Sequence, residues 1–310
     1  MTARAAGHVL LVAPYEYRTN AETADSNAFQ RAVGPTESAA LAEQAVSQHR
    51  ALRNLLIENG VQVTVVRSLR ETPDAPFCNN WFSTHPARAE TLPTFVLYPM
   101  MAPSRRIERR GALVQMLQQW YPRRIDYSAR EAAGQFLEST GSLCLDDVNR
   151  VAYAAVSIRT NLKLTQDWAR DLGYRLVAFE ATDSEGLPYY HTNVMMFLGH
   201  GLAGICLESI AETAQAGMVG RAEVLASLEA GGFEILPLSR AQLLRYCGNC
   251  LPLINDEGEP LLVMSSVAFY GFGPVEQARI RRHARILHSD LSAFETLGGG
   301  SARCLLAELF

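Results

Sequence analysis

The sequence feature that most constrains the fold is a regular alternation of short apolar segments with longer amphipathic ones. Along the 310 residues, the order strand, strand, helix, strand recurs several times, with no long linker and no residue-level repeat. Strands that alternate with helices are typical of an α/β fold. The absence of a linker favours one domain over residues 1–310, made of similar small units.

Apolar periodicity and helix-boundary residues predict the individual elements. Thr36 is a suitable N-cap for one helix, Gly60 a suitable stop, and Gly173 closes another helix. The irregular polar segment 14–36 has a length typical of lids and binding loops. Helices are predicted over 36–59, 107–120, 162–172, 219–230 and 274–288. Strands are predicted over 8–13, 61–66, 95–100, 123–127, 143–145, 151–156, 174–179, 194–198, 203–207, 233–238, 251–254 and 261–264.

Composition excludes several classes of protein. Hydrophobic residues make up 48% and charged residues 19%, as in a folded globular chain. The formal net charge of −4 argues against a nucleic-acid partner. No apolar run approaches the roughly 18 residues of a membrane span, and no signal peptide is visible. With six dispersed cysteines, the sequence predicts a cytoplasmic protein with reduced thiols and no membrane partner.

Two cysteines have the CxxC spacing of some redox and zinc sites, in Cys247-Gly-Asn-Cys250. There is no second pair at metal-ligand spacing and no thioredoxin-like sequence around it. We therefore predict no metal and no cofactor, and keep a metal or thiol-redox role only as an alternative that metal analysis would test.

The C-terminal segment contains one cysteine shortly after a run of glycines. Gly298, Gly299 and Gly300 precede Cys304, and Leu-Leu-Ala-Glu-Leu-Phe follows it. Such an apolar end is expected to be built into the fold. Glycines permit close approach by a ligand or by other backbone, whereas a free cysteine is often simply buried. From the residues alone, Cys304 is either a nucleophile or a core thiol.

Two further residues would complete a thiol-based catalytic set. Glu138 lies between apolar residues beside a strand, and His191 lies at a loop-to-strand junction. A thiol, an imidazole and a carboxylate have the composition of a nucleophile, an acid/base and an orienting group. Arg105 and Arg159 each follow a strand, where they are either solvated or able to clamp a substrate carboxylate.

Seven motifs in order give the chain a resemblance to a known family. It resembles the guanidino-group-modifying enzymes (amidinotransferase, arginine deiminase and dimethylarginine dimethylaminohydrolase), and most closely the citrulline-utilisation hydrolase branch. The resemblance covers essentially the whole chain. It implies a five-bladed α/β propeller, or pentein, of ββαβ units with pseudo-fivefold symmetry around a substrate channel. The motifs are Asn20-Ala-Glu-Thr with Asn27-Ala-Phe-Gln, Phe77-Cys-Asn-Asn-Trp, Ala102-Pro-Ser-Arg-Arg-Ile-Glu, Leu137-Glu-Ser-Thr-Gly-Ser, Arg159-Thr-Asn, His191-Thr-Asn-Val-Met-Met and Gly298-Gly-Gly-Ser-Ala-Arg-Cys304.

The resemblance also implies roles for individual residues. Cys304 matches the family nucleophile, His191 the general acid/base and Glu138 its carboxylate partner. Arg105 and Arg159 match positions that hold the substrate α-carboxylate. The substrate-binding set expected on this basis is Asn80, Asn193, Arg105, Arg159, Asn27 and Asp74.

The chain departs from arginine-type relatives where those relatives carry carboxylates. Asn80 replaces an aspartate that grips a cationic guanidinium, and Asn193 replaces a second one in arginine deiminase. Burying a guanidinium without paired anions is costly, whereas an amide can both donate to and accept from a neutral ureido group. This favours citrulline, although Asp74 is close enough in sequence to restore some cation binding.

The sequence thus predicts a cysteine-dependent hydrolase that converts the amino acid citrulline to ornithine, carbon dioxide and ammonia. The alternatives are an arginine dihydrolase or deiminase, an amidinotransferase, or a non-catalytic binding protein on the same fold. Oligomeric state stays open, a homo-oligomer included.

Overall fold

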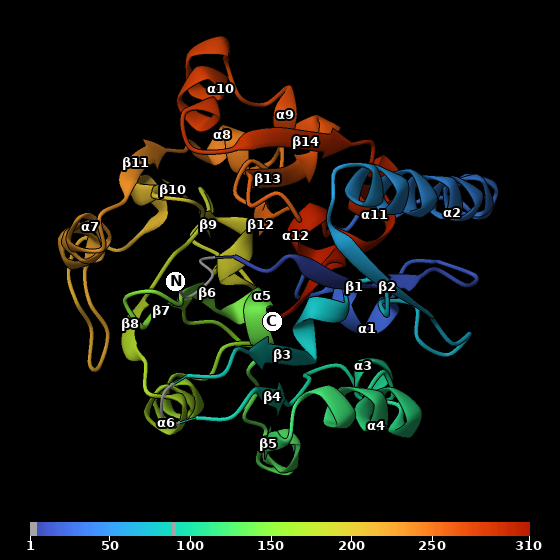
Figure 1. The fold of residues 1–310 in the computed structure, drawn as a ribbon, viewed down its shortest axis with the longest axis horizontal. Coiled ribbons are helices and arrows are strands. Elements are labelled where there is room, and N and C mark those ends of the chain that lie inside the picture. Colours follow the sequence, from blue (N-terminus) through green and yellow to red (C-terminus); the bar gives the residue numbers. More distant parts are fainter. Residues whose placement is uncertain (1–4, 89–90) are drawn as a thin grey trace.

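A computed structural model describes residues 5–88 and 91–310. Within these residues, fifteen strands form five mixed sheets of three strands each. Figure 1 shows the sheets arranged around a common centre, with the longer helices on the outside. None of the helices in the described ranges is long and apolar enough to cross a membrane.

All five sheets share one pairing pattern. In each, an antiparallel pair is followed by a parallel strand that is reached through a helical crossover. Parallel neighbours need such a crossover, and the recurring order predicted from the sequence is its result. The strands are β1 (His8–Ala13), β2 (Gln62–Arg67), β3 (Phe82–His85), β4 (Thr94–Leu97), β5 (Arg123–Asp126), β6 (Cys144–Asp146), β7 (Val151–Ala155), β8 (Arg175–Phe179), β9 (Met196–Leu198), β10 (Leu202–Ile205), β11 (Glu234–Pro237), β12 (Leu251–Ile254), β13 (Pro260–Ser265), β14 (Arg285–Ser289) and β15 (Ala307–Leu309).

The helices begin and end at residues with clear physical reasons. Pro35 occupies the first turn of α2, where its missing N–H costs nothing. The Asn161 side chain caps α6 by accepting from the Leu164 N–H, and Gly173 ends it in the left-handed conformation, at φ +71°. The helices are α1 (Ala21–Ala24), α2 (Pro35–Glu58), α3 (Pro103–Arg106), α4 (Gly111–Trp120), α5 (Ser139–Ser142), α6 (Leu162–Leu172), α7 (Arg221–Ala230), α8 (Arg240–Leu243), α9 (Ser266–Phe269), α10 (Pro274–Arg281), α11 (Ser292–Gly298) and α12 (Ala302–Leu305). Short 3₁₀ turns are η1 (Cys78–Asn80), η2 (Ser128–Ala133), η3 (Thr192–Val194) and η4 (Leu207–Ser209).

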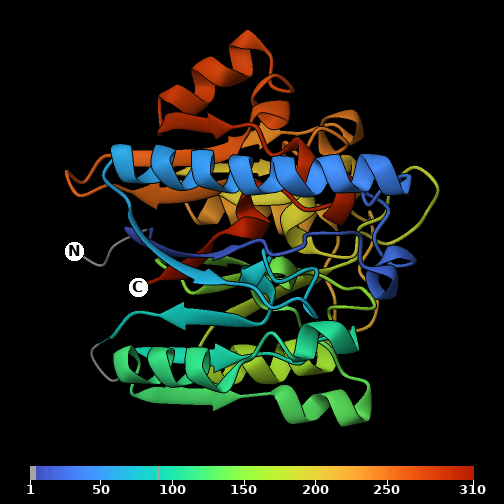
Figure 2. The same cartoon turned by 90° about the vertical axis from the view of Figure 1, so that its right-hand side faces the viewer.

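The C-terminal segment is built into the fold, as predicted, and the structure shows it as a strand of the first sheet. Strand β15 pairs antiparallel with β1, with Leu10 opposite Ala307, while β2 pairs parallel with β1 on its other side. Figure 2 shows α2, the crossover between β1 and β2, lying along the outside of the molecule beside these strands. One sheet therefore joins the two ends of the described chain.

Several elements of the structure differ from the predicted ones. The predicted helix 274–288 is wrong in its second half, because α10 ends at Arg281 and β14 pairs parallel with β13. Leu287 of β14 is buried in the core, so tertiary packing overrides the local helical pattern. The predicted helix 107–120 begins only at Gly111. Strand β3 was not predicted, because its Ser, Thr and His residues look like a loop although all of its side chains are buried.

Candidate active site

A small buried cavity brings together most of the predicted site residues. Its volume is about 20 Å³, room for roughly one water molecule, so a substrate enters only if part of the wall moves. Seven of the nine predicted residues line it, while Glu138 and Asn193 lie directly behind the wall. The lining residues are Thr23, Asn27, Asp74, Phe77, Asn80, Arg105, Arg159, Tyr190, His191, Gly298, Gly300 and Cys304.

A buried carboxylate–imidazole pair forms one side of the cavity. Glu138, just before α5, places Oε2 2.8 Å from His191 Nε2 and 3.5 Å from Arg159 Nη1. The Met101 N–H donates to Glu138 Oε1 at 3.1 Å. Burial raises the pKa of Glu138, but Arg159 and His191 outweigh burial and lower this pKa to about 2. Glu138 is therefore an anion at neutral pH.

His191 is neutral at the same pH. Burial lowers its pKa to about 4, although Glu138 acts in the opposite direction. Because an ionised carboxylate can only accept, the hydrogen on Nε2 is assigned from its partner and points at Glu138. Nδ1 is then the free basic nitrogen. It lies toward Gly141, where a Cβ would come within 2.8 Å of it.

The sulfur of Cys304 lies among amide groups. Its Sγ is 3.3 Å from Asn249 Nδ2 and 3.7 Å from Asn193 Nδ2. Burial raises the pKa of the Cys304 thiol, and the hydrogen bond from Asn249 acts against this rise. In the part of the chain that the structure describes, no charged side chain forms a hydrogen bond or ion pair with this sulfur. The groups that bond to the sulfur are therefore uncharged amides, while the nearby Arg303 charge also acts to lower the pKa of the thiol.

Arg105 lines the cavity, as its predicted role requires, but most of its donors are bound to protein groups. Its guanidinium donates to both carboxylate oxygens of Glu108, at 2.9 and 3.1 Å, to the Phe77 carbonyl and to Asn80 Oδ1 at 2.6 Å. These bonds use four of the five N–H donors of Arg105 and leave one Nη1 hydrogen for another acceptor. Arg105 also fixes the orientation of the Asn80 amide, whose Nδ2 donates to Asn79 at 3.0 Å.

Two unpartnered polar atoms belong to side chains that line the cavity, Asp74 and Arg159. Asp74 Oδ2 accepts from Asn20 and Thr23, but the buried Oδ1 of Asp74 has no hydrogen-bond partner among the described residues. Arg159 donates to the Thr23 carbonyl and to Ser26, while its buried Nε also has no partner within them. A carboxylate oxygen and a guanidinium N–H are thus open near the same residue, Thr23.

The irregular segment 14–36, whose length is typical of lids and binding loops, contributes part of the cavity wall. Thr23 and Asn27 line the cavity, and Asn27 Nδ2 donates to the Gly298 carbonyl at 2.9 Å. Gly298 and Gly300 also line the cavity, and a Cβ at either would meet Phe77 within 2.7 Å. The glycine run therefore allows close packing above the cysteine.

The sequence reasoning missed Asn249, which lies inside the CxxC segment. Cys247 and Cys250 are free and buried, and it is the asparagine between them that reaches Cys304. The sequence signal was an asparagine directly before an apolar strand, as at Asn80 and Asn193. Tyr190 was also missed, although its ring lies 5.0 Å from the Arg159 guanidinium.

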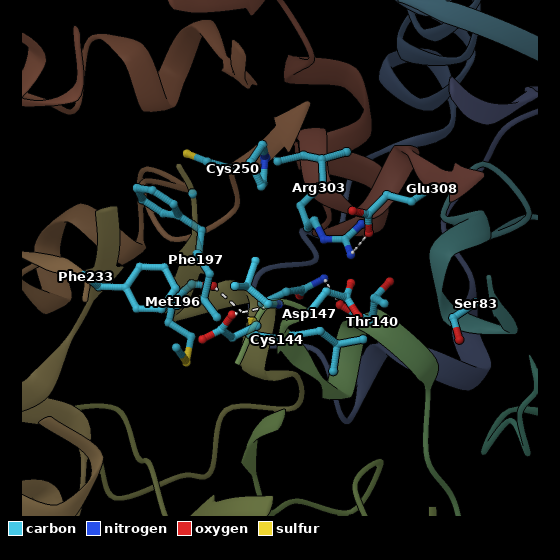
Figure 3. A pocket seen from close by; sticks show the side chains of 18 of the residues that line it. Ser83, Thr140, Cys144, Asp147, Met196, Phe197, Phe233, Cys250, Arg303 and Glu308 are labelled. Atoms are coloured by element: carbon cyan, nitrogen blue, oxygen red, sulfur yellow. Dashed lines mark hydrogen bonds and ion pairs between the residues drawn. The ribbon is translucent and has the colours of Figure 1, made fainter. Parts of the chain in front are cut away.

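A second, larger cavity of about 170 Å³ lies behind the site (Figure 3). Asn193 and Thr140 line it, and Asn193 also contacts Cys304, so a single layer of side chains separates the two cavities. Arg303 faces this larger cavity and forms an ion pair with Glu308 at 2.7 Å. The larger cavity contains neither His191 nor Cys304, and we place the chemistry in the smaller one. Across the described ranges, no group of three acidic, His or Cys side chains could hold a metal ion.

Solved structures of similar fold are enzymes that act on arginine or its derivatives. The N-terminal domain of ArgZ, an arginine dihydrolase from the ornithine–ammonia cycle in cyanobacteria, has a TM-score of 0.73 at 15% identity and covers 97% of each chain. For whole ArgZ the TM-score is 0.72 at 16% identity, with 97% of this chain but 40% of that chain covered. A dimethylarginine dimethylaminohydrolase adduct has a TM-score of 0.65 at 16% identity, covering 97% of this chain and 99% of that one. These structures share the α/β fold, and this chain spans less than half of whole ArgZ.

The family follows from a separate sequence comparison. The family model described as N,N dimethylarginine dimethylhydrolase, eukaryotic, matches residues 13–310. The chain therefore belongs to this family, and with it to the superfamily of guanidino-group-modifying enzymes, as the motifs predicted. No curated protein matches the chain in sequence.

Proposed function

We propose that this protein is a cysteine-dependent hydrolase of a ureido or guanidino amino acid, with citrulline as the preferred substrate. We also propose that the five sheets are the blades of one pentein propeller, a single catalytic domain over residues 1–310 with pseudo-fivefold symmetry. The observation that carries the choice of substrate is that the sulfur of Cys304 is contacted by uncharged groups, the amides of Asn193 and Asn249, and not by a carboxylate.

The amino-acid end of the substrate would bind where polar atoms are open. Arg159 Nε is free to donate to an α-carboxylate, and Asp74 Oδ1 is free to accept from an α-ammonium. Both side chains contact Thr23, so they can hold the two charges of one amino acid. Asn27 would hold the lid segment closed over the bound substrate. This clamp serves citrulline and arginine equally, because both carry the same two groups.

The reacting end would distinguish between these substrates by charge. A guanidinium there would lose its hydration without an anion in contact, which is expensive. A ureido group is neutral, and the Asn80 and Asn193 amides offer it both donors and acceptors. Arg105 would serve this end indirectly, by fixing the Asn80 amide with its 2.6 Å hydrogen bond.

The geometry supports a two-stage mechanism. His191 Nδ1 takes the Cys304 proton, and the sulfur attacks the ureido carbon while Glu138 stabilises the imidazolium. The imidazolium protonates the terminal amine, which leaves as ammonia when its C–N bond breaks. His191 then deprotonates a water molecule that attacks the thiocarbamate carbon, and the C–S bond breaks to return the thiol. The carbamate product decomposes to ornithine and carbon dioxide, so no cofactor or metal is needed.

The deciding experiment assays ammonia, citrulline and ornithine from citrulline and arginine side by side. We expect ornithine and ammonia from citrulline, and no activity in Cys304→Ser. Asn80→Asp should raise the arginine-to-citrulline ratio of kcat/KM, because it places an anion beside the reacting carbon, whereas exposed Asn54→Asp should not. Full activity in Cys304→Ser would refute the mechanism, and an unchanged ratio in Asn80→Asp would refute the charge argument.

A second candidate is an arginine dihydrolase, the activity printed for ArgZ. The free Asp74 carboxylate favours it, since an anion in the cavity could also hold a guanidinium. Citrulline formed from arginine and then consumed would indicate this reaction. Citrulline that accumulates would indicate a deiminase, and transfer to an added amine would indicate an amidinotransferase. Binding without any product would indicate a non-catalytic binding protein.

A further inference from the structure

The buried sulfur of Cys304 needs a source of stabilisation once it loses its proton. The Arg303 charge favours the thiolate, yet among the described side chains the hydrogen-bond partners of the sulfur are the amides of Asn193 and Asn249, and none is a cation. We propose that Asn249 is a catalytic residue whose side-chain amide holds the Cys304 sulfur in place and stabilises its thiolate form. This inference rests on the nucleophilic role proposed for Cys304, and it adds a residue that none of the seven family motifs included.

The contacts of Asn249 determine how its amide is oriented. Its Oδ1 accepts from the Arg303 N–H at 3.0 Å, and its Nδ2 donates to the Asn193 carbonyl at 2.9 Å. A backbone N–H can only donate and a carbonyl can only accept, so the reversed amide would face two mismatches. The second Nδ2 hydrogen is then available to the Cys304 sulfur, 3.3 Å from Nδ2.

The amide cannot easily move away from the sulfur. Asn249 is only 1% exposed, and its two backbone partners lie on different segments, before β15 and before β9. The Asn249 side chain is thus already fixed before the reaction begins, so no side-chain entropy is lost when it stabilises the thiolate. This is what a preorganised hydrogen-bond donor requires. A hydrogen bond to the charged form of a group favours that form over the neutral one.

The repeated architecture independently places Asn249 among the site residues. Asn80, Asn193, Asn249 and Cys304 each lie two or three residues before the first strand of their sheets, β3, β9, β12 and β15. Gly141 has the same place before β6, and a Cβ there would lie 2.5 Å from Asn80 Nδ2 and 2.8 Å from His191. Four of the five equivalent positions thus present a side chain toward the site, and the fifth must be small.

A purely structural role is the competing explanation, because Asn249 also connects two segments. Ultraviolet thiolate absorbance separates the two roles without any substrate. The absorbance is recorded as a function of pH for wild type and for each variant. The absorbance of the same protein carrying Cys304→Ser is then subtracted, which leaves the signal of Cys304 alone. We expect Asn249→Ala to raise the midpoint of Cys304 ionisation by about one to two pH units.

Asn249→Ser is the variant that preserves the fold, because its oxygen can still accept from the Arg303 N–H while no donor reaches the sulfur. It should show the same upward shift, and Asn255→Ala, a buried asparagine that bonds to Glu259 instead, should show none. The proposal is supported if Cys304 ionises at a higher midpoint pH in a folded Asn249 variant than in wild type. It is also supported if the midpoint of that variant moves above the pH range in which the fold survives. An unchanged midpoint in a folded variant overturns it, even if melting temperature or turnover falls.

The result is independent of the substrate. If Cys304→Ser abolishes turnover and the midpoint does not move, only the role of Asn249 fails. If the midpoint rises but Cys304→Ser remains active, the amide contact is real and the proposed function fails.

Discussion

Glu138→Gln should destabilise the protein in a way that depends on pH. The substitution keeps the shape of the side chain but removes the anion between His191 and Arg159. Arg159 would then be buried with one ion-pair partner fewer, and the imidazolium formed during turnover would lose its counterion. The effect is therefore expected in both folding free energy and kcat.

The structure sets the magnitude of the stability effect. The pKa of Glu138 falls from 4.5 to about 2 on folding, because Arg159 and His191 outweigh the effect of burial. Such a depression corresponds to about 3 kcal/mol of folding free energy at neutral pH. Because the folded pKa is the lower one, this stability is complete above pH 4.5 and is lost as pH falls toward 2. The kcat should fall about 100-fold, within the range for a general acid/base.

Guanidinium chloride unfolding at several pH values measures this difference directly. At pH 7, Glu138→Gln should be less stable than wild type, and the gap should narrow steadily below pH 4.5. The control is Glu16→Gln, which breaks an exposed ion pair with Arg70 and should change stability little. A Glu138→Gln gap that is small at pH 7, or that does not change with pH, would refute the electrostatic reasoning.

Two further predictions concern the histidine. Gly141→Ala should lower kcat at least about 100-fold, because its Cβ would lie 2.8 Å from His191 and 2.5 Å from Asn80. Gly111→Ala, with no neighbour within 4 Å, should be fully active in the same steady-state assay, and equal activity of the two variants would contradict the packing argument. Because burial lowers the pKa of His191 to about 4, the acid limb of kcat/KM should lie near pH 4, and a limb near 6.5 would show that His191 is not the base.

Local signals predicted the fold well where they agreed with tertiary packing. Helix α6 has the predicted bounds because Asn161 and Gly173 mark both of its ends. These local signals failed where burial, and not the intrinsic propensity of the residues, determines whether a segment forms a strand or a helix. The polar residues of β3 form a strand because two neighbouring strands and the core enclose them, and His288 lies on β14 although the helical pattern runs through it.

The candidate site was predictable in its members but not in their connections. Motifs pointed to Cys304 and His191, and the structure places both at one cavity. No sequence pattern could show that Glu108 and Asn80 already occupy the Arg105 guanidinium, since that depends on side-chain direction. Asn249 was missed for a related reason, because its partners Cys304 and Asn193 are distant in sequence. The CxxC spacing was interpreted only through its two cysteines.

The pairing of β1 with β15 has a consequence for how the protein is made. Residue 8 lies opposite residue 309, so β1 keeps one unpaired edge during synthesis until residue 309 has left the ribosome. Because this contact joins residues so far apart in the sequence, its closure is predicted to be slow. A nascent chain that stops before Ala307 would carry Cys304, His191 and Glu138 and still lack the strand that holds the sulfur in place. Activity should therefore appear late, as one event with the closing of the ring.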